Sequence, residues 1–209
     1  MTNKQLLLLL GVGISLCSVL LLFVSDKGDM VLWLNEHRTT IADVLFKYGT
    51  HFGDGLMYIP ILLFLFIYRK WYFFYLLSCG VFHGVVALIF KQWIFKGLPR
   101  PKAFFDEGVL SFVEGVKIHS SNSFPSGHTA TAFSLAIALA LIINRKSYTL
   151  LLFGLAIVAG VSRVYLSQHF LMDVTAGAMI GMTGSWGLWH FYFQKERQLL
   201  KKTSKVNTY

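Results

Sequence analysis

Long apolar runs are the feature of this sequence that most restricts its fold. Hydropathy separates six of them, and each is close to the roughly 20 residues that a helix needs to cross a bilayer. Only 14% of the residues are charged, whereas soluble domains carry about 25%. The sequence therefore predicts an all-α polytopic membrane protein, a bundle of six transmembrane helices forming one membrane-embedded domain over residues 1–209. The predicted spans are residues 6–24, 53–69, 71–91, 129–144, 148–167 and 171–194.

The charges between these spans predict an orientation. Six spans place both termini on one side, together with the tight turns near Arg69 and Arg145. That side holds ten basic residues and one acidic residue, whereas the opposite side holds nine of each. Cytoplasmic loops are enriched in Lys and Arg. Counted by Lys and Arg alone, the two sides hold nearly equal numbers of basic residues. If the outer basic residues belong to a binding site, function explains their presence there, and the basic side with the termini is then the cytoplasmic one. The basic tail, residues 195–209, would then lie against anionic headgroups.

Residues 30–48, on the predicted outer side, show a helical period. Their apolar side chains recur at steps of three and four residues, which is typical of an amphipathic helix. The stretch is too polar to span a bilayer. We therefore expect one amphipathic helix at the outer interface, between spans one and two.

Polar and charged side chains gather at the outer ends of the spans. His169 and Asp173 open span six four residues apart, so on a helix they share one face. Arg163 closes span five just before them. Charged groups beside membrane spans are costly and are read by default as functional. Other members of the set are Lys91, Lys96, Arg100, Ser126, Gly127 and His128.

The cations in this set suit a phosphate group. Arginine binds phosphate through a bidentate fork, and we expect Arg100, Arg163 and a lysine to stabilise its oxygens. The pair Ser126-Gly127 begins a predicted helix, where backbone N–H groups and the helix dipole attract an oxyanion.

The two histidines predict the chemical steps. His169, held by Asp173, is the expected nucleophile and would form a phosphohistidine. His128 is the expected general acid on the leaving oxygen, and then the base that activates water. The same three side chains could instead be metal ligands. Two arginines beside a dication would be repulsive, however, and no further carboxylate cluster exists.

Three motifs together resemble the signatures of the type 2 phosphatidic acid phosphatase superfamily, membrane lipid phosphatases related to the vanadium haloperoxidases. They are Pro125–His128, then Ser162–Asp173, and before both a lysine with Arg100-Pro101, so the catalytic motifs occupy residues 91–173. The resemblance implies the residue roles given above and an enzyme that works without a metal or other cofactor. It covers most of the chain.

The first motif departs from the family pattern. The family lysine lies seven residues before the arginine, and Trp93 occupies that position here. Lys91 lies nine residues before Arg100 and Lys96 four before it. We favour Lys91 as the phosphate-binding lysine, because it ends a span and precedes a longer loop. Lys96 is the alternative.

The resemblance implies metal-independent removal of phosphate from a lipid phosphate or pyrophosphate at the outer face of the membrane. Candidate substrates are undecaprenyl pyrophosphate, phosphatidylglycerophosphate, phosphatidic acid and the phosphates of lipid A. The expected location is a bacterial inner membrane, with the active site outside. Membrane lipids are the expected partners, and no nucleic-acid signature is present. The alternative is a transporter or binder of a phosphorylated lipid that performs no chemistry.

Overall fold

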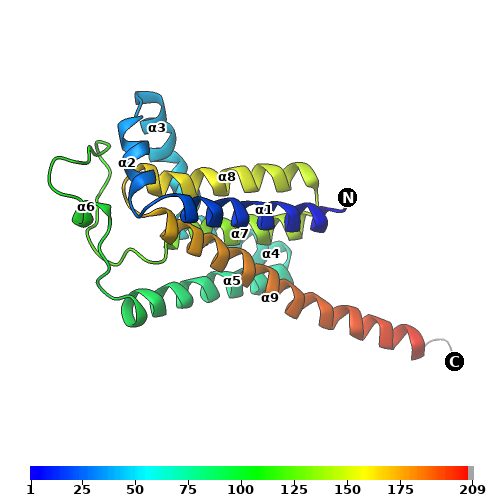
Figure 1. Cartoon of the computed structure of the whole chain (residues 1–209). Coiled ribbons are helices and arrows are strands. Elements are labelled where there is room, and N and C mark those ends of the chain that lie inside the picture. The colour runs from blue at the N-terminus through cyan, green and yellow to red at the C-terminus, as the bar shows by residue number, and fades with distance from the viewer. Residues whose placement is uncertain (207–209) are drawn as a thin grey trace.

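The computed structural model describes the backbone of residues 1–206 and the side chains of residues 1–193. Within that range the regular elements are helices joined by turns and loops (Figure 1). The predicted basic tail, residues 195–209, lies outside the described side chains. The α-helices are α1 (Asn3–Val24), α2 (Asp29–Glu36), α3 (Thr40–Gly49), α4 (Tyr58–Tyr68), α5 (Lys70–Ile89), α6 (Pro101–Phe104), α7 (Gly127–Ile143), α8 (Lys146–Tyr165) and α9 (Leu171–Val206). Two 3₁₀ turns, η1 (Thr50–Gly53) and η2 (Gly55–Met57), join α3 to α4, and a π-helical turn, η3 (Phe90–Ile94), extends α5.

Three of the described helices are long and apolar enough to cross a membrane. They are α1, the continuous helix Lys70–Ile94 and α8. The helix pair Thr40–Gly53 and Gly55–Tyr68, bent by 57°, makes a fourth crossing if it is counted as one span. The apolar helix α7 has only 17 residues. The prediction of an all-α membrane fold is therefore confirmed, while the number of six spans stays a prediction.

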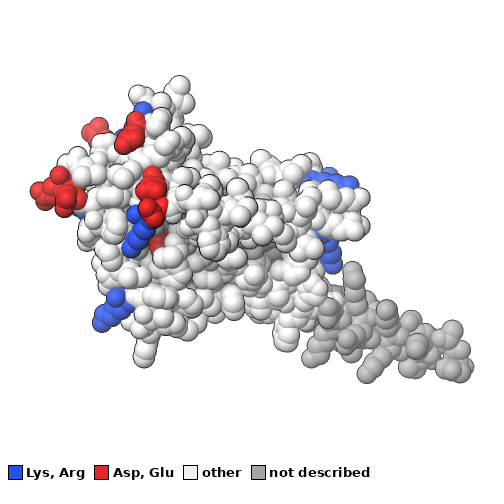
Figure 2. Space-filling view, in the orientation of Figure 1, with Lys and Arg blue, Asp and Glu red and all other residues white. Residues whose placement is uncertain are grey.

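Charged side chains lie at the two ends of this bundle. Figure 2 shows a broad band of uncharged side chains between them. Acidic and basic side chains are both visible at the end that carries α2, α3 and α6, whereas the coloured charges at the other end are basic. This arrangement agrees with a membrane belt around the middle of the bundle.

The close approach of α9 to α7 forms the centre of the bundle and positions the site. A methyl group in place of the Gly177 hydrogen would lie 2.5 Å from the Ser126 carbonyl oxygen, and one on Gly181 would collide with the Ala130 carbonyl. Small residues let membrane helices approach to backbone contact. These glycines therefore hold the first turn of α9, with Asp173, against the first turn of α7.

Hydrogen bonds inside the uncharged band also connect the helices. The Tyr58 hydroxyl of α4 donates to Ser134 Oγ of α7 at 2.8 Å. Ser134 Oγ lies 2.7 Å from Ser185 Oγ of α9. His83 Nε2 of α5 lies 3.2 Å from Thr131 Oγ1 of α7. Such contacts between buried polar groups fix which faces of the helices meet.

The prediction of one amphipathic helix over residues 30–48 is wrong, because the structure has two helices there. The chain leaves α2 at His37 and begins α3 after Thr39, whose Oγ1 accepts the Ala42 N–H at 3.2 Å. A threonine N-cap of this kind starts a new helix. The apolar side chains of α3 remain largely exposed, as expected of a helix at an interface; they are Ile41, Val44, Leu45 and Tyr48.

Candidate active site

A Schellman motif at the end of α8 sets the position of the predicted nucleophile. The Gln168 N–H donates to the Arg163 carbonyl at 2.9 Å, and the Ser167 N–H donates to the Val164 carbonyl at 2.9 Å. Ser167 takes the left-handed conformation that this motif requires, with φ of 53°. The His169 N–H also donates to the Arg163 carbonyl, at 3.1 Å. Arg163 and His169 are thus tied together through the backbone.

The start of α9 completes this corner. Asp173 is the third residue of the helix, and its Oδ2 accepts the Phe170 N–H at 2.9 Å, as in one half of a capping box. The same oxygen lies 3.3 Å from His169 Nδ1 and accepts a hydrogen bond from the Ser123 hydroxyl. His169 is 1% exposed and Asp173 2% exposed. The expected histidine–carboxylate pair is formed, and it is buried.

Ser123 is a member of the site that sequence reasoning missed. It lies in the loop before α7, three residues ahead of Ser126, and its side chain is buried. Nothing in a loop serine indicates a partner 50 residues away. Only its place just before the Pro125–His128 motif could have suggested that it accompanies the site.

Burial lowers the pKa of His169 to about 3, and Arg100 and Arg163 act in the same direction. The contact with Asp173 opposes these effects without outweighing them. The imidazole is therefore neutral at pH 7. With Nδ1 donating to the carboxylate, the lone pair of Nε2 is available for attack.

The start of α7 supplies backbone donors, though fewer than expected. Ser126 is the N-cap, and its Oγ accepts from the Thr129 hydroxyl at 2.9 Å. Its own N–H donates to the Asp173 carbonyl at 2.9 Å, which removes that donor from the predicted oxyanion cradle. Gly127 and His128 are the first two helical residues, whose N–H groups find no acceptor within a helix. Both are half-buried, so a ligand can reach them.

Of the two candidate lysines, Lys91 lies beside the start of α7. A methyl group in place of the Gly127 hydrogen would lie 3.8 Å from Lys91 Nζ. Lys96 is exposed in the loop, and Trp93 is 83% exposed. The π turn η3, closed by a 2.7 Å hydrogen bond from the Phe95 N–H to the Phe90 carbonyl, changes the register of this helix end. Binding of phosphate by Lys91 stays a prediction.

The two arginines have different surroundings. Arg100 donates from Nε to the Ser121 carbonyl at 2.8 Å and from Nη1 to the Gln168 carbonyl at 3.1 Å, so it joins two loops. Burial lowers the pKa of Arg100, although Asp173 acts in the opposite direction. Arg163 donates from Nη1 to Thr50 Oγ1 at 2.7 Å, while its buried Nε has no hydrogen-bond partner among the described residues. Arg163 therefore has the freer guanidinium.

These contacts gather cations and hydrogen-bond donors that suit an anion. Arg163, Lys91 and the first N–H groups of α7 are cationic or donor groups, and they adjoin the buried His169–Asp173 pair. Among the described residues, no three His, Cys, Asp or Glu side chains are grouped to hold a metal ion. The predicted site residues thus come together from η3, from the start of α6, and from the ends of α7, α8 and α9. Their individual roles stay predictions.

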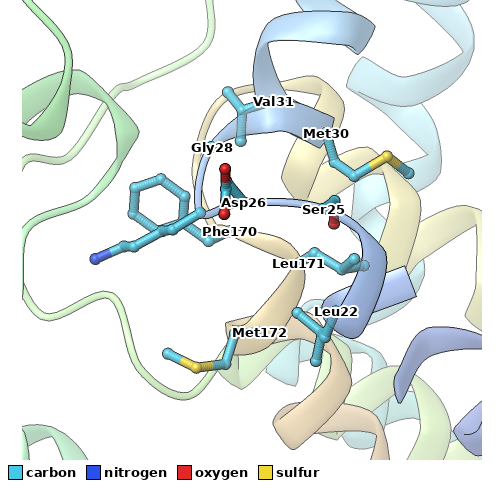
Figure 3. Close-up of a pocket in the computed structure, with 10 residues that line it drawn as sticks. Leu22, Ser25, Asp26, Gly28, Met30, Val31, Phe170, Leu171 and Met172 are labelled. Carbon is cyan, nitrogen blue, oxygen red and sulfur yellow. The ribbon is translucent and has the colours of Figure 1, made fainter. Parts of the chain in front are cut away.

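A cavity of about 230 Å³ lies behind the nucleophile corner and is separate from this site. The start of α9 (Phe170, Leu171 and Met172), the end of α1 and the turn into α2 line it, as Figure 3 shows. His169 and Asp173 do not line it. The Lys27 ammonium lies 4.7 Å from the centre of the Phe170 ring and so links this turn to the start of α9.

Comparison with known proteins assigns the family. The chain belongs to the PAP2 superfamily, whose sequence profile matches residues 58–197. The lipid A 1-phosphatase of Rhizobium etli is 36% identical over 115 residues, which cover 55% of this chain and 48% of the relative. Phosphatidylglycerophosphatase B of Bacillus subtilis is 28% identical over 156 residues, which cover 72% of this chain and 71% of the relative. The chain thus matches about half the length of the rhizobial enzyme.

Solved structures agree with this assignment. The crystal structure of Aquifex aeolicus LpxE is similar with a TM-score of 0.69 and 28% identity, over 78% of this chain and 94% of that one. A transmembrane PAP2 type phosphatidylglycerolphosphate phosphatase of Bacillus subtilis shares the fold with a TM-score of 0.63, at 22% identity over 90% of this chain and 93% of that one. The protein is therefore an integral membrane protein with the PAP2 transmembrane fold.

Proposed function

We propose that this protein removes phosphate from a phosphorylated membrane lipid at the outer face of a bacterial inner membrane, with a phosphohistidine on His169 as intermediate. The observation that carries the proposal is the buried, neutral His169 paired with Asp173 and tied to Arg163. A neutral imidazole with one nitrogen held by a carboxylate is a nucleophile, and the adjacent cations suit a phosphoryl group. Family membership supports the same chemistry.

The reaction would proceed in two displacements. His169 Nε2 attacks phosphorus, the bond to the lipid oxygen breaks, and His128 gives its proton to that oxygen. His128 then takes a proton from water, whose oxygen attacks the phosphohistidine. The phosphorus–nitrogen bond breaks, inorganic phosphate leaves, and His169 is neutral again. Asp173 stabilises the positive charge that the imidazole acquires between the two steps.

The relatives narrow the substrate to a lipid phosphate. The named enzymes act on lipid A or on phosphatidylglycerophosphate. For this chain, lipid A phosphates, phosphatidylglycerophosphate and undecaprenyl pyrophosphate lead the candidates, because proteins named for each of them are similar to it, and phosphatidic acid follows. The outer-face location and the cytoplasmic termini are supported by the charges of the bundle, which are mixed at one end and basic at the other.

A panel of lipid phosphates tests the proposal. Purified protein in detergent is incubated with each lipid, and released phosphate is measured with and without a chelator. We expect release that the chelator does not change, and a loss of at least about 10³-fold in His169→Ala. His190→Ala, which replaces an exposed histidine in the middle of α9, is the matched control and should retain full activity. Equal release by wild type and His169→Ala would overturn the phosphohistidine, and lipid binding without release would favour the transporter or binder.

A further inference from the structure

The 3₁₀ turn η1 (Thr50–Gly53) contributes to the site from outside the family motifs. It precedes residues 58–197, which the family profile matches. A methyl group in place of the Gly53 hydrogen would lie 2.5 Å from the His128 carbonyl oxygen, so the turn packs directly on the backbone of the predicted general acid. Its first residue, Thr50, reaches the end of α8.

Thr50 holds one end of the Arg163 guanidinium. Its Oγ1 accepts from Arg163 Nη1 at 2.7 Å, and the two residues are 9% and 7% exposed. The Thr50 backbone is fixed in turn, because its N–H donates to carbonyls of the last turn of α3. A β-branched side chain on a fixed backbone has few χ1 choices. The hydroxyl is thus a stationary acceptor for Nη1.

The rest of the guanidinium is left for a ligand. Its buried Nε has no partner among the described residues, and no described carboxylate lies within ion-pair distance of Arg163. A guanidinium can offer a pair of donors in two ways, through Nε with Nη2 or through Nη1 with Nη2. Thr50 occupies Nη1, so the pair made by Nε and Nη2 is still free. A buried cation without an anionic partner is costly. The free fork is therefore matched to the two oxygens of a phosphoryl group.

We infer that Thr50 is a positioning residue that holds Arg163 with its Nε–Nη2 fork toward the transferring phosphoryl group. This inference rests on the proposed function. Without the hydroxyl, the guanidinium would lose a hydrogen bond and could rotate, so phosphoryl oxygens would bind in the ground state but be stabilised less in the transition state. The predicted signature is a larger effect on kcat than on KM.

The test compares hydroxyl-free and hydroxyl-bearing side chains. Thr50→Val removes the hydroxyl at nearly constant shape, and we expect it to lower kcat and weaken inhibition by vanadate, each about 10-fold. Thr50→Ser keeps the acceptor and should stay within about twofold of wild type for both. Thr183→Val removes the hydroxyl of an exposed threonine that bonds only within α9, and it should change neither. Thr50→Ala serves as a second variant if Thr50→Val does not purify as a folded protein.

Coupling to Arg163 separates positioning from a general structural role. In an Arg163→Lys background, which lacks the fork, Thr50→Val should add little further loss. The same fractional loss in both backgrounds, or wild-type vanadate inhibition in Thr50→Val, would overturn the inference. Vanadate binding measured by calorimetry also distinguishes a failure of the proposed enzymatic function from a failure of the proposed role of Thr50. If the protein releases no phosphate but Thr50→Val still binds vanadate more weakly than wild type does, the proposed enzymatic function is wrong and the proposed role of Thr50 stands.

Discussion

The nucleophile corner (residues 162–173) and the lysine segment (residues 90–100) are both expected to meet the same phosphate, yet they are built differently. The corner is almost entirely buried. A backbone hydrogen bond ties His169 to Arg163, and the Asp173 side chain contacts the His169 ring. In the lysine segment, residues 92–97 are exposed and the helix ends in a π turn. A site can therefore combine a rigid part, fixed by short-range contacts, with a part whose register is set by one irregular turn.

Among tests of this difference between the two regions, the largest expected effect concerns which lysine the segment presents. Lys91→Ala removes the ammonium that lies beside Gly127 and should lower kcat/KM about 10²-fold, as loss of one oxyanion donor does. Lys96→Ala removes an exposed charge and should stay within about twofold, because solvent screens it. Initial rates of phosphate release from a lipid phosphate measure both.

Moving the lysine sharpens this comparison. In the Lys91→Ala background, Trp93→Lys restores the usual family spacing to Arg100. Trp93 is 83% exposed, so we expect no recovery of activity. Recovery would mean that position 93 reaches the phosphate and that the π turn does not set the register as described.

The difference between the two regions also explains what the sequence could predict. The pairing of His169 with Asp173 was predicted from their spacing of four residues. The structure forms the pair in another way, because α9 begins at Leu171 and His169 lies just before the helix, where Asp173 caps the Phe170 N–H. The apolar runs likewise predicted the long helices, and Ser126 was recognisable as a helix start. The break at Thr39 was missed because an apolar period of three and four continues through both helices. The contacts of Ser123 and Thr50 join positions 50 and 113 residues apart, and no local pattern records such pairs.

A smaller effect on activity is expected from Ser123, which connects the loop before α7 to the nucleophile corner. Ser123→Ala removes one of the donors to Asp173 Oδ2, while the Phe170 N–H remains. Loss of a hydrogen bond to a charged group should lower kcat about 10-fold, because the carboxylate would orient His169 less well. Ser121→Ala, an exposed serine in the same loop, is the matched control. Unchanged phosphate release in Ser123→Ala would show that the corner is held by its own backbone alone.

The smallest effect concerns the stability of the corner itself. Ser167 has φ of 53°, and its buried Oγ has no hydrogen-bond partner among the described residues. Ser167→Gly removes the steric cost of the left-handed conformation, about 1–2 kcal/mol. The greater freedom of glycine in the unfolded chain opposes this gain by about 0.5–1 kcal/mol. We expect a net stabilisation of about 1 kcal/mol, with activity retained, and thermal unfolding in detergent measures it.

Asn144→Gly is the control for Ser167→Gly, because Asn144 ends α7 with the same φ of 53° but is exposed. Asparagine tolerates this conformation better than serine does, so the gain there should be smaller. A lower unfolding temperature in Ser167→Gly would mean that the Ser167 side chain stabilises the corner through packing. A higher temperature with reduced activity would mean that serine restricts the loop in a way that catalysis needs. Either result would place part of the rigidity of the corner in this one residue rather than in its backbone hydrogen bonds.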